Sequence, residues 1–171
     1  MSIFTASTNS FRGKRTDETT VLVTRKHWIL LLPMLVTLFI LILLPFIVCA
    51  LIEKEIWWHD FSSLYWFLVA VHFLVLWILS FYSITMYFLN TLVVTNKRVI
   101  ENKQDGFFKY TMNEMELERI QDITVKVFGP LASFLDFGDI EIQSAGTTNK
   151  FYLSRFPHPK KIKETIMGLK I

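Results

Sequence analysis

The sequence predicts an α-helical transmembrane hairpin of two spans followed by a mainly-β domain. Two long apolar runs, Trp28 to Ile52 and Leu64 to Leu89, flank a short polar insert. At ~1.5 Å per helical residue each run exceeds the ~30 Å of bilayer hydrocarbon, so both can span it. After Leu89, apolar and polar residues alternate between turn dipeptides, which is typical of half-buried strands.

These changes of pattern divide the chain of 171 residues into five parts. The parts are an N-terminal segment (1–27), a first span (28–52), a loop (53–63), a second span (64–89) and a β-rich domain (90–171). Trp28, Tyr65 and Trp66 open the two spans, where amphipathic aromatic rings prefer the headgroup level. The last part holds about 80 residues, enough for one modest core.

Basic residues near the spans predict the side of the membrane on which each part lies. Five of them precede the first span, namely Arg12, Lys14, Arg15, Arg25 and Lys26. Lys54 alone lies between the spans, whereas Lys97 and Arg98 follow the second. The positive-inside rule then places both termini in the cytoplasm and the 53–63 loop outside. A cleaved signal peptide is disfavoured, because the first run is too long and no small-x-small site follows it.

The β-rich domain is expected to begin with three antiparallel strands joined by tight turns. Leu92 to Thr95 and Arg98 to Glu101 flank the dipeptide Asn96-Lys97, which suits a two-residue turn. The dipeptide Asp105-Gly106 is a stronger turn signal, and Phe107 to Asn113 returns from it as the third strand.

Later elements follow from alternation and from turn residues. A fourth strand starts near Arg119, because Ile123, Val125 and Val127 alternate with polar residues before Gly129-Pro130 ends the pattern. The remaining predictions are a helical turn at Leu131 to Leu135, strands at Asp139 to Ser144 and Lys150 to Ser154, and a helix from Pro159 with Ile162, Ile166 and Leu169 on one face.

The segment Thr20 to Thr24, just before the first span, has two interpretations. Its β-rich composition suits a seventh strand, and a cytoplasmic N-terminus would lie beside the start of the domain at Asn90. The same residues also suit the first turn of the membrane helix. The pattern leaves both open.

Four spaced motifs follow the hairpin: Leu92 to Ile100, Gly106, Glu118 to Val125 and Phe137 to Ile140. Together with the preceding two spans, they resemble the bacterial pleckstrin-homology (PH) domain family, the YdbS-like membrane proteins. The resemblance covers Asn90 to about Ile171. It implies a PH-like fold, with a bent antiparallel sheet closed at one end by the C-terminal helix. It implies no catalytic residues and does not name a ligand.

Basic side chains are the candidate contacts for lipid headgroups or for a partner. They are Lys97 and Arg98 at the first turn, Lys103 and Lys109 around the second, and Arg119 and Lys126 on the fourth strand. Each Lys or Arg near an anionic leaflet contributes up to ~1 kcal/mol. The domain holds almost as many acidic as basic residues, however, so a solvated surface of mixed charge is an equal alternative.

Three polar residues of the second span, His72, Ser80 and Ser83, are candidates for an intramembrane contact. An ionisable residue inside a span suggests a functional role. No Asp, Glu, Lys or Arg lies between Leu64 and Leu89 to build a proton relay with His72. We therefore favour helix association over transport.

Catalytic, metal and cofactor sites are not expected. Asp136-Phe137-Gly138 spells the kinase metal-binding tripeptide, but the other kinase motifs are absent from the sequence. The four histidines have no ligand spacing, and the single Cys49 excludes both an intramolecular disulfide and a cysteine-based zinc site. Nucleic acid is a poor partner, because no basic stripe carries interleaved aromatic residues.

The favoured hypothesis is a non-enzymatic, multi-pass protein of the bacterial plasma membrane whose PH-like domain recognises a protein partner, a second copy or lipid headgroups. No cofactor is expected. The alternative is a subunit of a small oligomeric channel or transporter. An enzyme completed by another subunit is the third hypothesis, for which the sequence offers no nucleophile, carboxylate pair or metal cluster.

Overall fold

The computed structural model describes residues 15, 17–55, 58–145 and 150–170. The chain divides into two compact units, of which one is the hairpin Trp28–Tyr87 and the other combines the residues on either side of it. The second unit therefore joins the segment before the first span to the domain after the second span. The predicted domain at 90–171 is thus only part of this folded unit.

The hairpin unit contains a short 3₁₀ turn, η1 (Trp28–Leu31), and the helices α1 (Leu32–Ile52) and α2 (Trp58–Leu89). The candidate membrane spans Trp28–Ile52 and Trp58–Leu89 have mean hydropathies of 3.2 and 2.2. Their most apolar stretches are only 6% and 11% buried, so these are not the core helices of a water-soluble fold. Two such helices indicate a membrane protein.

Helix α2 begins at Trp58 rather than at the predicted start of the second span, Leu64. Its 32 residues measure about 48 Å, which exceeds the ~30 Å of hydrocarbon. The additional turns carry Asp60, Ser62 and Ser63. The helix therefore continues into a polar segment that hydropathy alone assigned to the loop.

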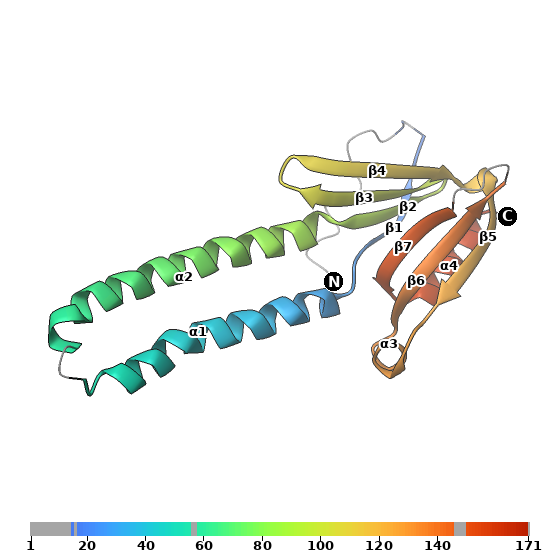
Figure 1. Cartoon of the computed structure of the whole chain (residues 1–171). Coiled ribbons are helices and arrows are strands. Elements are labelled where there is room, and N and C mark those ends of the chain that lie inside the picture. Colours follow the sequence, from blue (N-terminus) through green and yellow to red (C-terminus); the bar gives the residue numbers. More distant parts are fainter. Residues whose placement is uncertain (1–14, 16, 56–57, 146–149, 171) are drawn as a thin grey trace. The chain divides into compact units, whose positions relative to one another are not determined.

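The first sheet of the β unit contains β1 (Thr20–Arg25), β2 (Thr91–Thr95), β3 (Arg98–Gly106) and β4 (Lys109–Glu116) in that spatial order (Figure 1). All three pairings are antiparallel. The segment before the first span is thus a strand, which decides between its two interpretations. Arg25 lies opposite Thr91, so the chain leaves the sheet for the hairpin and returns to it at paired positions.

The predicted turn Asn96-Lys97 connects β2 to β3, but the turn expected at Asp105-Gly106 is wrong. Strand β3 continues to Gly106, which lies opposite Lys109, and Phe107 and Phe108 form the turn. The register shifts between Gln104 and Gly106, and the Gln104 side-chain amide donates to the carbonyls of Gly106 and Phe107. The Gln104 side chain thus provides hydrogen-bond donors for carbonyls of the turn, which the sequence pattern did not predict.

The second sheet contains β5 (Ile120–Lys126), β6 (Phe137–Ser144) and β7 (Lys150–Pro157), antiparallel and in that order. The 3₁₀ turn η2 (Leu117–Arg119) precedes β5, and α3 (Pro130–Phe134) connects β5 to β6. Helix α4 (Pro159–Leu169) packs on β5 and β6. The strands and helices expected after Arg119 are confirmed, although the β structure is divided between two sheets.

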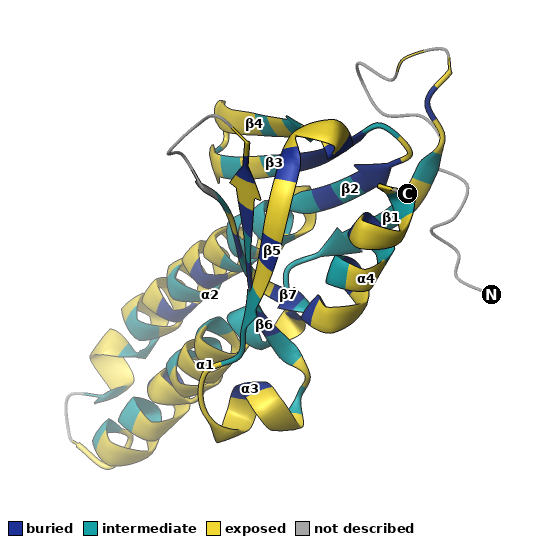
Figure 2. Cartoon of the chain, turned by 90° about the vertical axis from the view of Figure 1, so that its right-hand side faces the viewer, coloured by how far each residue is buried: buried dark blue, intermediate teal, exposed yellow. Residues whose placement is uncertain are grey.

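The core of the β unit lies between the two sheets and α4, where the buried positions of Figure 2 converge. Its buried members are Leu92, Val94, Val99, Leu117, Ile120, Ile123, Ile140, Ile142, Leu153, Phe156, Ile162 and Ile166. Phe156 and Ile140 are completely inaccessible to solvent. The expected inward faces of β6 and α4 are therefore those that form the core.

Gly138 at the start of β6 permits a close approach between strands, which gives a test of the packing. A β-carbon there would lie 2.6 Å from the Lys126 carbonyl oxygen and 3.0 Å from Val127 Cγ2. We expect Gly138→Ala to lower the free energy of unfolding by about 1–3 kcal/mol, because backbone atoms must move. The measurement is thermal unfolding of the full chain in detergent, followed by far-ultraviolet circular dichroism.

Gly168→Ala in α4 is the matched control, because its β-carbon would meet no heavy atom within 4 Å. We expect it to leave stability unchanged or to raise it by about 0.5–1 kcal/mol, since alanine favours a helix. Equal destabilisation by the two substitutions would contradict the packing described for Gly138.

Candidate functional site

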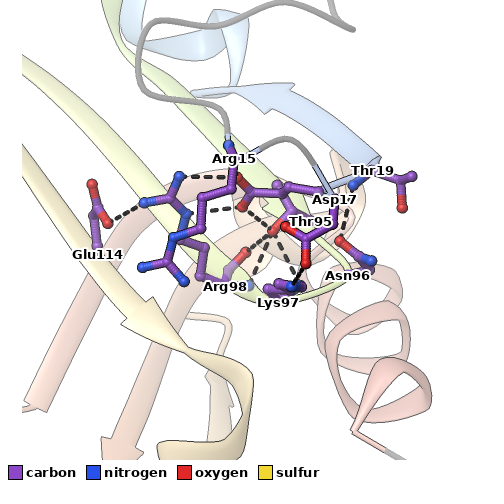
Figure 3. Close-up of polar contacts among 9 residues, drawn as sticks. Arg15, Asp17, Thr19, Thr95, Asn96, Lys97, Arg98 and Glu114 are labelled. Carbon is purple, nitrogen blue, oxygen red and sulfur yellow. Dashed lines mark hydrogen bonds and ion pairs between the residues drawn. The ribbon is translucent and has the colours of Figure 1, made fainter.

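Arg98 is the centre of a buried polar network at the start of β3 (Figure 3). Its Nε and Nη2 donate to the two carboxylate oxygens of Glu18 at 2.8 and 2.9 Å. Nη1 donates to Glu114 Oε2 on β4 at 2.5 Å. Arg98 and Glu18 are only 5% and 2% exposed. The arginine therefore joins the segment before β1 to the far strand of the first sheet.

Thr95 completes the network from the end of β2. Its hydroxyl oxygen lies 2.8 Å from Glu18 Oε1 and accepts the Arg98 backbone N–H at 3.0 Å. The Arg15 backbone N–H donates to Glu18 Oε2 at 3.0 Å. The Glu18 carboxylate thus receives donors from three separate parts of the unit, which compensates its burial.

These contacts shift the protonation of both charged groups. The Arg98 hydrogen bonds, opposed by burial, lower the pKa of Glu18 from 4.5 to about 2. The hydrogen bond to Glu18 raises the pKa of Arg98 above its ordinary value. Both groups therefore remain charged at neutral pH and form a buried ion pair.

Around this ion pair, the polypeptide before β1 is attached to the β2–β3 turn. The Thr19 backbone N–H donates to Asn96 Oδ1 at 2.9 Å, and the Asn96 backbone N–H donates to the Thr19 carbonyl at 3.0 Å. Lys97 forms an ion pair with Asp17 (Figure 3). The β2–β3 turn is thus bound to the segment before β1 by backbone hydrogen bonds and by side-chain contacts.

The basic residues predicted to meet headgroups are largely engaged within the unit. Arg98 is buried, which corrects its proposed role as a surface contact. The exposed or half-exposed pairs are Lys97 with Asp17, Lys103 with Asp105, Arg119 with Glu116 and Lys126 with Glu141. Lys109 is exposed and forms no ion pair with a described residue. These cations face separate carboxylates rather than one ligand position.

The polar residues of the second span make hydrogen bonds within the hairpin. His72 Nε2 lies 3.0 Å from the Leu41 carbonyl oxygen of α1, which links the two helices. Ser80 and Ser83 donate to the carbonyls of Leu76 and Leu79 on their own helix, at 2.6 and 2.9 Å. The His72 contact suits helix association, whereas the hydrogen bonds of Ser80 and Ser83 lie within α2.

A groove of about 660 Å³ lies between β4 and the second sheet. Its lining includes Arg98, Glu114, Arg119, Phe151 and Tyr152, so it is mixed in charge and partly aromatic. The sequence identified Arg98 and Arg119 but gave no reason to place them beside β7. That juxtaposition depends on how the two sheets meet.

Strand β4 is an open edge beside this groove. Among the described strands it pairs with β3 alone, and most of its side chains are exposed. Tyr110 and Met112 are 63% and 45% exposed. An unpaired edge of this length presents backbone donors and acceptors in the arrangement that an added strand requires.

Among the described residues, no cluster of three or more His, Cys, Asp or Glu side chains is placed to hold a metal ion. Asp136-Phe137-Gly138 occupies the beginning of β6, where Asp136 accepts the His158 backbone N–H at 2.8 Å through its carbonyl and its carboxylate lies 2.6 Å from His158 Nδ1. Asp136 of this tripeptide therefore joins the start of β6 to the end of β7 through its contacts with His158.

Two antiparallel sheets, a C-terminal helix and two candidate membrane helices define a PH-like protein with a membrane hairpin. The chain belongs to the Bacterial PH domain family, whose model matches residues 29–170. The match includes the hairpin as well as most of the β unit.

Two solved structures match about half of the chain. One is a DUF1696 family protein with a pleckstrin-homology domain from Shewanella loihica PV-4, with 19% identity, a TM-score of 0.40 and coverage of 48% of this chain and 71% of that one. The other is a pleckstrin-homology domain from Shewanella amazonensis SB2B, with 17% identity, a TM-score of 0.40 and coverage of 48% and 67%. No curated protein matches the chain.

The depressed pKa of Glu18 predicts a specific loss of stability in acid. A carboxyl whose pKa falls from 4.5 to about 2 on folding stabilises the fold above its unfolded pKa, and this contribution disappears as the pH falls towards 2. We expect Glu18→Gln to remove about 3 kcal/mol at neutral pH and to flatten the acid limb of the stability curve. Thermal unfolding of the full chain at a series of pH values measures both effects.

Asp17→Asn is the matched control, because Asp17 is the neighbouring carboxylate but its ion pair with Lys97 is solvent-exposed. We expect little change in stability from it at any pH. An acid limb as steep in Glu18→Gln as in the unsubstituted protein would show that other carboxylates control acid unfolding.

Proposed function

We propose that this protein is a non-enzymatic recognition module, anchored in the bacterial plasma membrane by its hairpin with both termini in the cytoplasm. Its partner is a protein segment that adds to the β4 edge in an extended conformation. The observation that carries this proposal is the open β4 edge beside the groove whose lining includes Glu114, Arg119 and Tyr152. The partner is either another protein or a second copy of the chain.

The β4 edge supports binding by strand addition for two reasons. Backbone groups along an unpaired edge give affinity without a particular side-chain sequence, and exposed side chains such as Tyr110 and Met112 add selectivity. The adjoining groove offers cations and carboxylates together, which suits a polypeptide better than a single anionic group.

Headgroup recognition by the predicted basic residues has less support. Arg98 is buried, and Lys97, Lys103, Arg119 and Lys126 each have a carboxylate partner. Removing a lysine from such a pair to meet a phosphate leaves the carboxylate near the same phosphate. Membrane anchoring also raises the local concentration of other membrane proteins, so a modest strand-addition affinity suffices.

Photocrosslinking along β4 tests the proposal. A photoreactive amino acid replaces Tyr110 or Met112 in the full chain, expressed in cells of the organism that encodes it. Because strands pair in register, we expect both positions to link to one partner segment, with the linked residue shifted by two when the probe moves by two. Mass spectrometry of the crosslinked peptides identifies the segment and distinguishes a second copy from another protein.

Lys161, exposed on α4, is the control position for the same probe. We expect it to give a much lower yield and no matching segment. Equal yields at all three positions, or linked residues that do not move with the probe, would exclude strand addition at β4.

A further inference from the structure

Two groups of large apolar side chains are exposed on loops of the β unit. At the β3–β4 turn, Phe107 is 57% exposed and Phe108 is fully exposed. On the connection between β5 and β6, Phe128 and Phe134 are 72% and 86% exposed, and Leu131 is also exposed. Exposure of phenylalanine to water is unfavourable, and clustered exposed apolar side chains mark sites of contact with protein or membrane.

The β3–β4 turn lies at the end of the first sheet from which the chain enters and leaves the hairpin. Arg25, three residues before the candidate span starting at Trp28, pairs with Thr91, and Thr91 pairs with Asn102. Strand β3 continues four positions past Asn102, to Gly106. At ~3.3 Å per residue, these four positions carry the strand about 13 Å beyond the residue that pairs with Thr91.

The second apolar group lies at an end of the second sheet that the same junction touches. His27, which immediately precedes the candidate span, stacks on Phe137 with ring centroids 4.9 Å apart. Its backbone N–H donates to the Arg155 carbonyl at 2.8 Å. Phe137 begins β6, directly after the connection that carries Phe128, Leu131 and Phe134. Both apolar groups are therefore near the residues that must lie at the membrane surface.

We propose that the β3–β4 turn and the α3 connection insert their phenylalanine side chains into the leaflet that the hairpin enters. Both apolar groups would thus contact lipid, at the depth of the headgroups and upper acyl chains. Lys109 follows Phe108 directly and is exposed, as expected of a cation that remains among anionic headgroups while its neighbour is immersed.

This insertion would give the domain three attachments to one leaflet: the hairpin junction and the two loops. Attachment at three places instead of one would restrict rotation of the domain about the hairpin. A restricted domain presents β4 at a constant inclination to the membrane. The inference rests on the membrane anchor of the proposed function, but it is independent of what binds to β4.

Site-directed spin labelling of the full chain tests insertion. In a Cys49→Ala background, a nitroxide is attached at Phe108→Cys or Phe134→Cys, and the protein is reconstituted in vesicles of phosphatidylethanolamine and phosphatidylglycerol. Accessibility to oxygen, which concentrates in lipid, is compared with accessibility to a water-soluble nickel chelate. We expect the oxygen-to-nickel ratio at both loop positions to be several-fold higher than at Lys161→Cys, an exposed position on α4.

A label at Leu74→Cys, near the middle of α2, separates this inference from the proposed anchor. A lipid-exposed label at position 74 with water-exposed labels at 108 and 134 would overturn loop insertion and leave the anchor intact. Water exposure at position 74 would overturn both. Protection of positions 108 and 134 from oxygen and nickel alike would show that protein covers them, which also overturns insertion into lipid.

Discussion

The pairing of β1 with β2 is the constraint on which the rest of the structure depends. It closes the β unit across the membrane hairpin, because one strand precedes the hairpin and the other follows it. The Glu18–Arg98 ion pair secures this closure from inside, with both partners almost inaccessible to solvent. An unpaired charge at either position would be costly, so the segment before the hairpin and the strands after it stabilise one another.

The ion pairs within the β unit determine which charged side chains remain on its surface to bind other molecules. Carboxylates partner most of the basic residues that the sequence marked for headgroups, and the first turn is occupied by the chain's own N-terminal segment. We instead propose recognition at the backbone edge of β4 and lipid contact at exposed apolar loop side chains such as Phe108 and Phe134. Neither of these surfaces is defined by formal charge, so a pattern of basic residues in the sequence does not identify it.

Local patterns predicted most of the fold and little of the site. Alternation at Ile140 and Ile142, the turn Asn96-Lys97 and the helix after Pro159 depend on neighbouring residues, so the sequence identified them. The Phe107-Phe108 turn was missed because the Gln104 side chain stabilises it, contrary to the usual preference for Asp-Gly. Burial of Arg98 was missed because its partner Glu18 is distant in sequence and lies across the hairpin.

The position of the hairpin between β1 and β2 also determines the order of events during synthesis. Strand β1 leaves the ribosome before either membrane helix, whereas its pairing strand follows both of them. The ribosome must therefore complete the second helix before the first sheet can close, and until then Glu18 has no arginine partner. The first sheet is therefore completed only after both membrane helices have been synthesised, so the segment that carries Glu18 waits for its partner strands through the whole synthesis of the hairpin.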